Sequence, residues 1–175
     1  MQRIGHYGKR TFASIYNYTS TTNPRVWFAI SQGEKDLGKI EFEVFENHVP
    51  NTANRFIERC DPEAELSYKD TEFTKVIDGF MAQGGDISGD SERHLDENLE
   101  LRHETRGTLT TQNTGPHSVS SEFMLTFGKT PWLDGYHTPF AQMTNGEDIL
   151  ASIEAAGSRD GTPAEQFVIS DCGRV

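Results

Sequence analysis

The sequence predicts a mainly β domain, a closed barrel or sandwich of short strands capped by two helices. Three observations predict this class: short apolar runs recur along the chain, glycine- and proline-containing turns separate them, and only two segments have the 3.6-residue apolar period of a helix. There is no internal repeat or low-complexity tract. A chain of 175 residues is long enough for one domain with one core.

The N-terminal part of this domain predicts a strand hairpin followed by a helix. Apolar residues alternate with other side chains over residues 26–30 and again over residues 40–44, and residues 31–38 supply the turn. Pro50 suits the first turn of a helix. The apolar residues after it have the spacing of one helix face: Ala53, Phe56, Ile57 and Cys60.

The rest of the chain predicts further short strands and the second helix. Glycine-rich turns separate the strands, which we expect at residues 73–77, 80–83, 107–111, 122–127 and 167–172. Asn145 can cap a helix that Gly157 ends. The buried face of this helix consists of Ile149, Leu150 and Ile153.

Composition excludes several classes of protein. Only 34% of the residues are hydrophobic, which excludes a membrane-spanning protein. Sixteen basic and 27 acidic residues give a net charge of −11, so the field of the protein repels nucleic acid. Cys60 and Cys172 lack the spacing of metal ligands, and we expect two buried, unpaired thiols in a reducing compartment.

Residues 1–25 form a basic, polar extension ahead of a domain at residues 26–175. Residues 1–33 contain four basic and no acidic residues, and they lack the apolar stretch of a secretion signal. We therefore expect a cytoplasmic protein, or a part of a cytoplasmic assembly, with a mitochondrial location as the alternative. The extension either docks the protein in a large assembly or folds back on the acidic body.

Several short motifs fail as functional sites. Gly84-Gly85-Asp86 has the glycines of a turn and lacks a phosphate-binding pattern. His103-Glu104 and the acidic residues Asp96, Glu97 and Glu100 lack metal-ligand spacing, and we expect a solvated surface there. The serines near His117 lack a nucleophile motif, so hydrolysis is not supported.

One set of apolar and amide-bearing blocks remains unexplained by these alternatives. The blocks are Phe73 to Asp86, Asn113 to Pro116, Glu122 to Met124, Trp132 to His137 and, near the end of the sequence, Ser170 to Gly173. In this order and spacing they resemble the cyclophilin family of peptidyl-prolyl cis-trans isomerases, from about Val26 to Val175. The resemblance implies a closed, eight-stranded antiparallel barrel capped by two helices.

The resemblance also implies a role for each matching position. The catalytic positions are Lys75, Phe80 and Gln83. A proline pocket is formed by Phe80, Met81, Met124, Leu133 and His137, with Trp132 at its rim. Gln83 and Asn113 hydrogen-bond the peptide backbone. The remaining substrate-binding positions are Gln112, Thr114, Glu122 and Phe123. The implied clients are proline-containing peptides or proteins.

The chemistry of this reaction explains why such residue types suffice. Rotation about an X-Pro bond crosses a barrier of about 18–20 kcal/mol because twisting breaks the amide resonance, but no covalent bond is made or broken. The catalyst must bind the proline ring and favour the twisted state. In that state the prolyl nitrogen accepts a hydrogen bond from a cationic donor, worth about 1.5–3 kcal/mol. We expect no metal and no cofactor.

Five positions depart from the family pattern in this one cleft. Lys75 stands where the family has arginine, and lysine lacks the planar guanidinium that can bond two acceptors at once. Glu122 replaces a glutamine, and its charge can pair with Lys75. The other departures are Thr74, Gln112 and Met124. We expect reduced isomerase activity and at most weak cyclosporin binding; the alternative is an inactive binding module anchored by residues 1–25.

Overall fold

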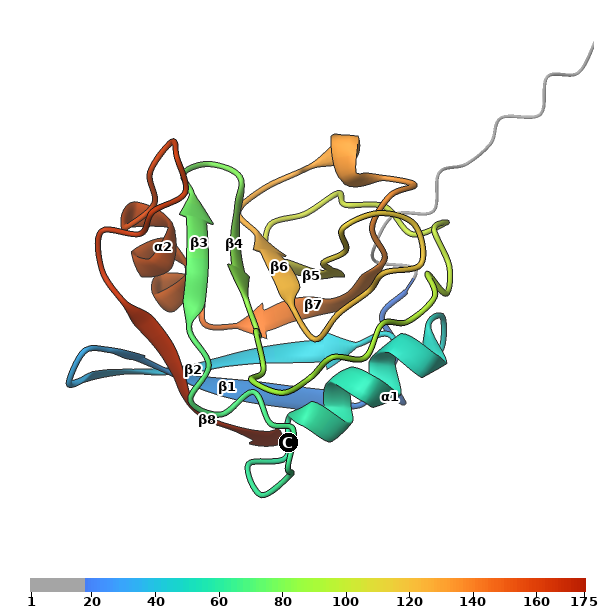
Figure 1. Ribbon diagram of the computed structural model, residues 1–175, viewed down its shortest axis with the longest axis horizontal. Helices are drawn as coiled ribbons and strands as arrows, with labels where there is room; N and C mark the ends of the chain where they lie inside the picture. Colours follow the sequence, from blue (N-terminus) through green and yellow to red (C-terminus); the bar gives the residue numbers. More distant parts are fainter. Residues whose placement is uncertain (1–17) are drawn as a thin grey trace, which may run out of the picture.

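In the computed structural model, which describes residues 18–175, antiparallel strands form one sheet that curves into a nearly closed barrel (Figure 1). The sheet of this described range has eight strands, in agreement with the fold class predicted above. The strands are β1 (Arg25–Gln32), β2 (Lys35–Val44), β3 (Phe73–Ile77), β4 (Met81–Gly84), β5 (Thr108–Thr111), β6 (Phe123–Thr126), β7 (Pro139–Asn145) and β8 (Phe167–Arg174).

The barrel closes where its two edge strands approach each other. The strand order is β3-β4-β6-β5-β7-β2-β1-β8, so β3 and β8 are the edges. The Ile169 amide donates to the carbonyl of Thr71 at 2.9 Å, and the Asp70 amide donates to the carbonyl of Ile169 at 2.7 Å. The Val76 amide of β3 donates to the carbonyl of Gly161. These bonds satisfy edge groups that would otherwise be open to another chain.

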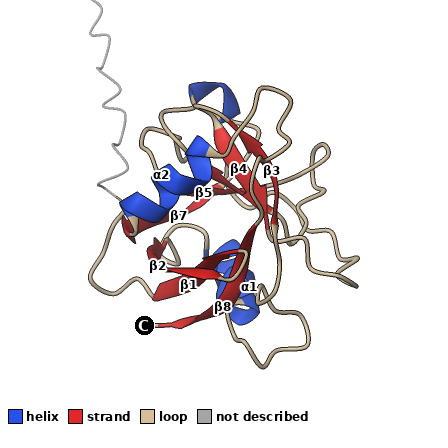
Figure 2. Cartoon of the chain, turned by 90° about the vertical axis from the view of Figure 1, so that its left-hand side faces the viewer, coloured by secondary structure: helices blue, strands red, loops and turns tan. Residues whose placement is uncertain are grey.

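Two helices cover the ends of the barrel. Helix α1 (Pro50–Arg59) and helix α2 (Glu147–Ala155) lie on opposite sides of the strands (Figure 2). Phe56 of α1 packs among aromatic rings inside the barrel, with its ring centroid 4.8 Å from that of Phe140. The predicted apolar faces of both helices are buried in this core. Pro50 opens α1, as predicted.

Strand β7 was absent from the expected strands, and the start of α2 differs from the prediction. Residues 139–145 show no clean alternation of apolar and polar side chains, so pairing with β2 and β5 is what makes them a strand. Gly146, at φ +106°, is the N-cap of α2, and Asn145 provides no side-chain cap. A Cβ at Gly146 would lie 2.8 Å from the Cα of Ile40, so glycine is needed there.

The predicted solvated surface at Asp96 and Glu97 is partly wrong. Glu97 lies at the N-terminus of α1, where its Oε1 accepts the Asn51 amide at 2.9 Å and its Oε2 accepts the Thr52 amide at 2.7 Å. Val49, the N-cap residue, cannot supply this bond. The Asp96 side chain is also largely buried and accepts the amide of His117.

The described part of the predicted extension lies against the barrel. The Tyr18 ring packs edge-on against His48, and Asn23 donates to the carbonyl of Tyr18 at 3.0 Å. Residues 1–17 lie outside the described residues, so the predictions about them stay predictions. Cys60 and Cys172 are buried and unpaired, as predicted, while the reducing compartment stays a prediction. No helix within residues 18–175 is long and apolar enough to cross a membrane.

Candidate active site

A second apolar cluster lies on the outer face of the sheet, separate from the barrel core. Met81, Met124 and Leu133 are buried in it, and Ile77 and Phe80 are partly buried against them. We call these five residues the outer apolar cluster. Their neighbours along β4 and β6 belong to the interior core, and successive side chains of a strand point to opposite faces. The barrel wall thus has apolar side chains on both faces at this place.

Strand register brings a polar row next to the outer apolar cluster. Lys75 of β3 is paired with Gln83 of β4, and Gln83 is paired with Met124 of β6. Paired residues in antiparallel strands point to the same face. The Gln83 amide nitrogen donates to Oε1 of Glu122 at 2.7 Å. Lys75, Gln83 and Glu122 therefore share the outer face with the cluster, and we call these three residues the polar row.

The Lys75 side chain is exposed at the edge of this face. Its aliphatic part lies over Gly161, where an added Cβ would be 2.7 Å from Cγ and Cε of the lysine. Within residues 18–175 its ammonium group has no ion pair and no hydrogen bond. The predicted ion pair between Glu122 and Lys75 is not formed within this range, and the Glu122 carboxylate accepts a hydrogen bond from Gln83 instead.

The segment after β6 forms one rim of the outer apolar cluster. A short 3-10 helix, η2 (Pro131–Leu133), places Leu133 in the cluster and leaves Trp132 59% exposed. The rings of Trp132 and Phe80 have centroids 5.5 Å apart. Tyr136, 72% exposed, follows on the same segment. Two aromatic rings thus reach solvent beside the cluster.

His137 is held close to β5. Its Nδ1 lies 2.9 Å from the carbonyl oxygen of Thr111, so Nδ1 carries the proton and donates. Burial lowers the pKa of His137, while the hydrogen bond to Thr111 and the charge of Asp96 act in the opposite direction. The imidazole is therefore neutral at pH 7.

The amide-bearing positions of the adjacent loop are engaged within the chain. Asn113 donates its side-chain amide to the carbonyl of Tyr136 at 2.9 Å, tying the loop to the rim. The backbone N–H of Thr114 donates to the hydroxyl of Ser118, and the backbone N–H of Gln112 donates to the carbonyl of Glu122. Gln112, Asn113 and Thr114 thus border the site as one braced loop.

Phe123 occupies a different place from the other predicted site residues. Its side chain is buried in the interior core, stacked on Phe28 with ring centroids 5.8 Å apart. Strand alternation explains this position, since Glu122 and Met124 on either side face outward. The prediction that the Phe123 side chain contacts substrate is therefore wrong, because this side chain faces the interior of the barrel.

A buried histidine beneath the rim was missed. His103, predicted to be solvated, has no exposed surface; its Nδ1 lies 2.8 Å from Asp134 Oδ1 and its Nε2 lies 2.9 Å from the Thr110 hydroxyl. Asp134 belongs to the rim and Thr110 to β5, so His103 joins the two. Burial lowers the pKa of His103, although Asp134 opposes that effect. The spacing of His103 along the chain contains no signal for this contact.

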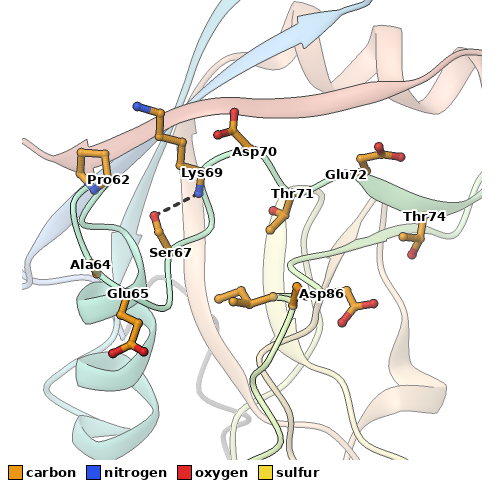
Figure 3. Close-up of a pocket in the computed structure, with 12 residues that line it drawn as sticks. Pro62, Ala64, Glu65, Ser67, Lys69, Asp70, Thr71, Glu72, Thr74 and Asp86 are labelled. Atoms are coloured by element: carbon orange, nitrogen blue, oxygen red, sulfur yellow. Dashed lines mark hydrogen bonds between the residues drawn. The ribbon is translucent and has the colours of Figure 1, made fainter.

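A groove of about 580 Å³ lies between the segment after α1 and the end of β4 (Figure 3). Carboxylates surround it, and the hydroxyl of Ser67 accepts the Lys69 amide at its wall. Its lining contains Thr74 but none of the predicted catalytic residues. Within residues 18–175 no His, Cys, Asp and Glu side chains are grouped as a metal site requires.

Comparison with known families decides which family this site belongs to. A family model described as "Cyclophilin type peptidyl-prolyl cis-trans isomerase/CLD" matches residues 28–174. The chain belongs to the cyclophilin family. The matched range of this cyclophilin contains the outer apolar cluster, the polar row and the rim, and a cyclophilin domain implies clients that contain proline.

Proposed function

We propose that this cyclophilin is a peptidyl-prolyl cis-trans isomerase with a reduced rate. The observation that carries the proposal is the outer apolar cluster, beside which strand pairing places Lys75 and Gln83 on the same face. When a proline ring binds on Met81, Met124 and Leu133, its apolar surface is removed from water, which favours binding. The adjacent polar row then contacts the peptide backbone.

Lys75 is the electrophilic donor in this proposal. As the X-Pro bond twists, the prolyl nitrogen regains its lone pair and accepts a hydrogen bond that the planar states cannot make. The Lys75 ammonium, without a partner among the described residues, is available for this bond. It is compact and strongly hydrated, so it stabilises the twisted state less well than a guanidinium would.

The first test restores the arginine. We expect Lys75→Arg to raise kcat/KM on a proline peptide roughly tenfold, since about 1.4 kcal/mol of transition-state stabilisation is worth that factor. Lys75→Gln should lower it. Two-dimensional exchange NMR on a peptide with one X-Pro bond measures both rates without a coupled protease. Lys35→Arg, on the hairpin far along β2, is the matched control. Equal rates in all four proteins would remove Lys75 from the mechanism.

A second candidate function is a binding module with little or no catalysis. It is favoured by the two amides that were expected to bind the peptide backbone, because Gln83 and Asn113 already donate to Glu122 and to Tyr136 within the chain. Such a module would bind proline segments on the outer apolar cluster, and residues 1–25 would anchor it in an assembly. Peptide binding without exchange enhancement, in both the wild type and Lys75→Arg, would support this candidate over the isomerase.

A further inference from the structure

Glu122 presents an uncompensated negative charge on the face that carries the outer apolar cluster. Its carboxylate is half-buried, and Oε1 accepts the amide of Gln83 at 2.7 Å. Within residues 18–175 its other oxygen, Oε2, has no hydrogen bond and no ion pair. A carboxylate has acceptor capacity for several donors, so Oε2 is available to a ligand.

No basic side chain within residues 18–175 forms an ion pair with the Glu122 carboxylate. Lys75 lies on the same face two strands away, and within residues 18–175 its ammonium group forms no ion pair with Glu122. Arg55 and Arg59 line a small cavity together with Glu122, and Arg59 forms an ion pair with Asp90 at 2.6 Å. Neither arginine lies within ion-pair distance of Glu122 in the described range.

The position of Glu122 relative to the cluster determines what it can recognise. Met124, two residues further along the chain, belongs to the outer apolar cluster, and Gln83 connects the two by strand pairing and by its hydrogen bond. A peptide whose proline lies on the cluster therefore has its neighbouring residues within reach of the carboxylate. An arginine or lysine there would form a charge-assisted hydrogen bond with Oε2, and an acidic residue would be repelled.

We propose that Glu122 makes this site selective for clients with a basic residue within two positions of the proline. The inference rests on the proposed proline-binding function and adds the class of client. It assigns to Glu122 a specificity role that is independent of bond rotation, because the carboxylate acts on the neighbouring side chain and Lys75 acts on the prolyl nitrogen.

The test uses two sets of short peptides with one Ala-Pro bond and the full-length protein. In one set the residue two positions before the proline is Arg, Gln or Glu, and in the other set the residue two positions after it is varied in the same way. We expect the Arg peptide of at least one set to have a two- to fivefold higher kcat/KM than the Gln peptide, the range of an exposed ion pair, with the Glu peptide lower still.

Glu122→Gln removes the charge and keeps an oxygen that can accept the Gln83 amide. In this variant the order of the three peptides should disappear, so that the Arg, Gln and Glu peptides are isomerised at one common rate. Glu72→Gln is the matched control, since Glu72 is an exposed carboxylate of the groove in Figure 3. The protein carries a net charge of −11, so a preference that both variants retain would reflect general attraction and would overturn the proposal.

Failure of the proposed function gives a different result. If no peptide is isomerised, the function is wrong, and the dissociation constants of the same peptides, measured by fluorescence of the exposed Trp132, still test the inference. Tighter binding of the Arg peptide that Glu122→Gln abolishes supports it. Normal isomerisation with no difference among the peptides overturns the client class and leaves the isomerase standing.

Discussion

The Lys75 side chain depends on Gly161 for its position. Gly161 has φ +89°, and the lysine stem covers the place where a Cβ would be. Gly89 has nearly the same backbone conformation, φ +88°, with no atom within 4 Å of an added Cβ. The two glycines therefore separate backbone strain from contact with Lys75.

Gly161→Ala and Gly89→Ala should each destabilise the protein by about 1–2 kcal/mol, the cost of a left-handed alanine. Only Gly161→Ala should also change the isomerase rate, because its methyl group displaces the Lys75 stem. Urea unfolding measures the stabilities, and exchange NMR measures the rates. Equal rates in the two variants would show that the position of Lys75 does not depend on Gly161.

At the scale of elements, helix α1 is capped from a distant loop. Burial alone would raise the pKa of Glu97, but its hydrogen bonds with Thr52 and Asn51 hold the pKa below its usual value. A carboxylate at this end also interacts favourably with the helix dipole. The bond links the loop before β5 to α1, which packs on the core beside the candidate site.

Glu97→Ala should cost about 1 kcal/mol at pH 7, as the loss of an N-cap does. A group with a lowered folded pKa stabilises above its unfolded pKa and loses that effect as pH falls through the folded pKa. The difference from the wild type should therefore shrink below about pH 4. Urea unfolding at pH 7 and at pH 3.5 measures it, with the exposed Glu100→Ala as control. A constant difference at both pH values would contradict the capping role.

For the whole molecule, three buried or partly buried histidines link stability to pH. Burial lowers the pKa values of His94, His103 and His137. Between the lowered folded pKa and the unfolded value near 6.5, the unfolded chain binds protons that the folded protein does not. These three histidines therefore act to lower the free energy of unfolding as the pH drops below about 6.5.

We expect His103→Gln to be less stable than the wild type at pH 8, because it disturbs the bonds to Asp134 and Thr110. It should lose less additional stability between pH 7 and pH 5, since one of the titrating groups is gone. Urea unfolding at unit pH intervals provides both curves. Parallel curves would show that His103 is not among the groups that cause the acid loss.

The local patterns of the chain account for most of the elements. Alternation predicted β1 and β2, and the periodicity after Pro50 predicted α1. These patterns suffice because a strand or helix with one apolar face has a single way to bury it. Strand β7 could not be predicted from such a pattern, because these residues form a strand through pairing with β2 on one side and β5 on the other.

The sequence by itself determined the barrel class and the cyclophilin family, and it predicted four of the five residues of the outer apolar cluster; Ile77 was not among the predicted pocket residues. Local periodicity and ordered motifs need no knowledge of distant contacts. Only the tertiary structure decided that Glu122 accepts a hydrogen bond from Gln83, that Lys75 lies over Gly161, and that His103 is buried beneath the rim. Each of these contacts joins segments far apart in the chain, and their side chains meet only when the barrel closes.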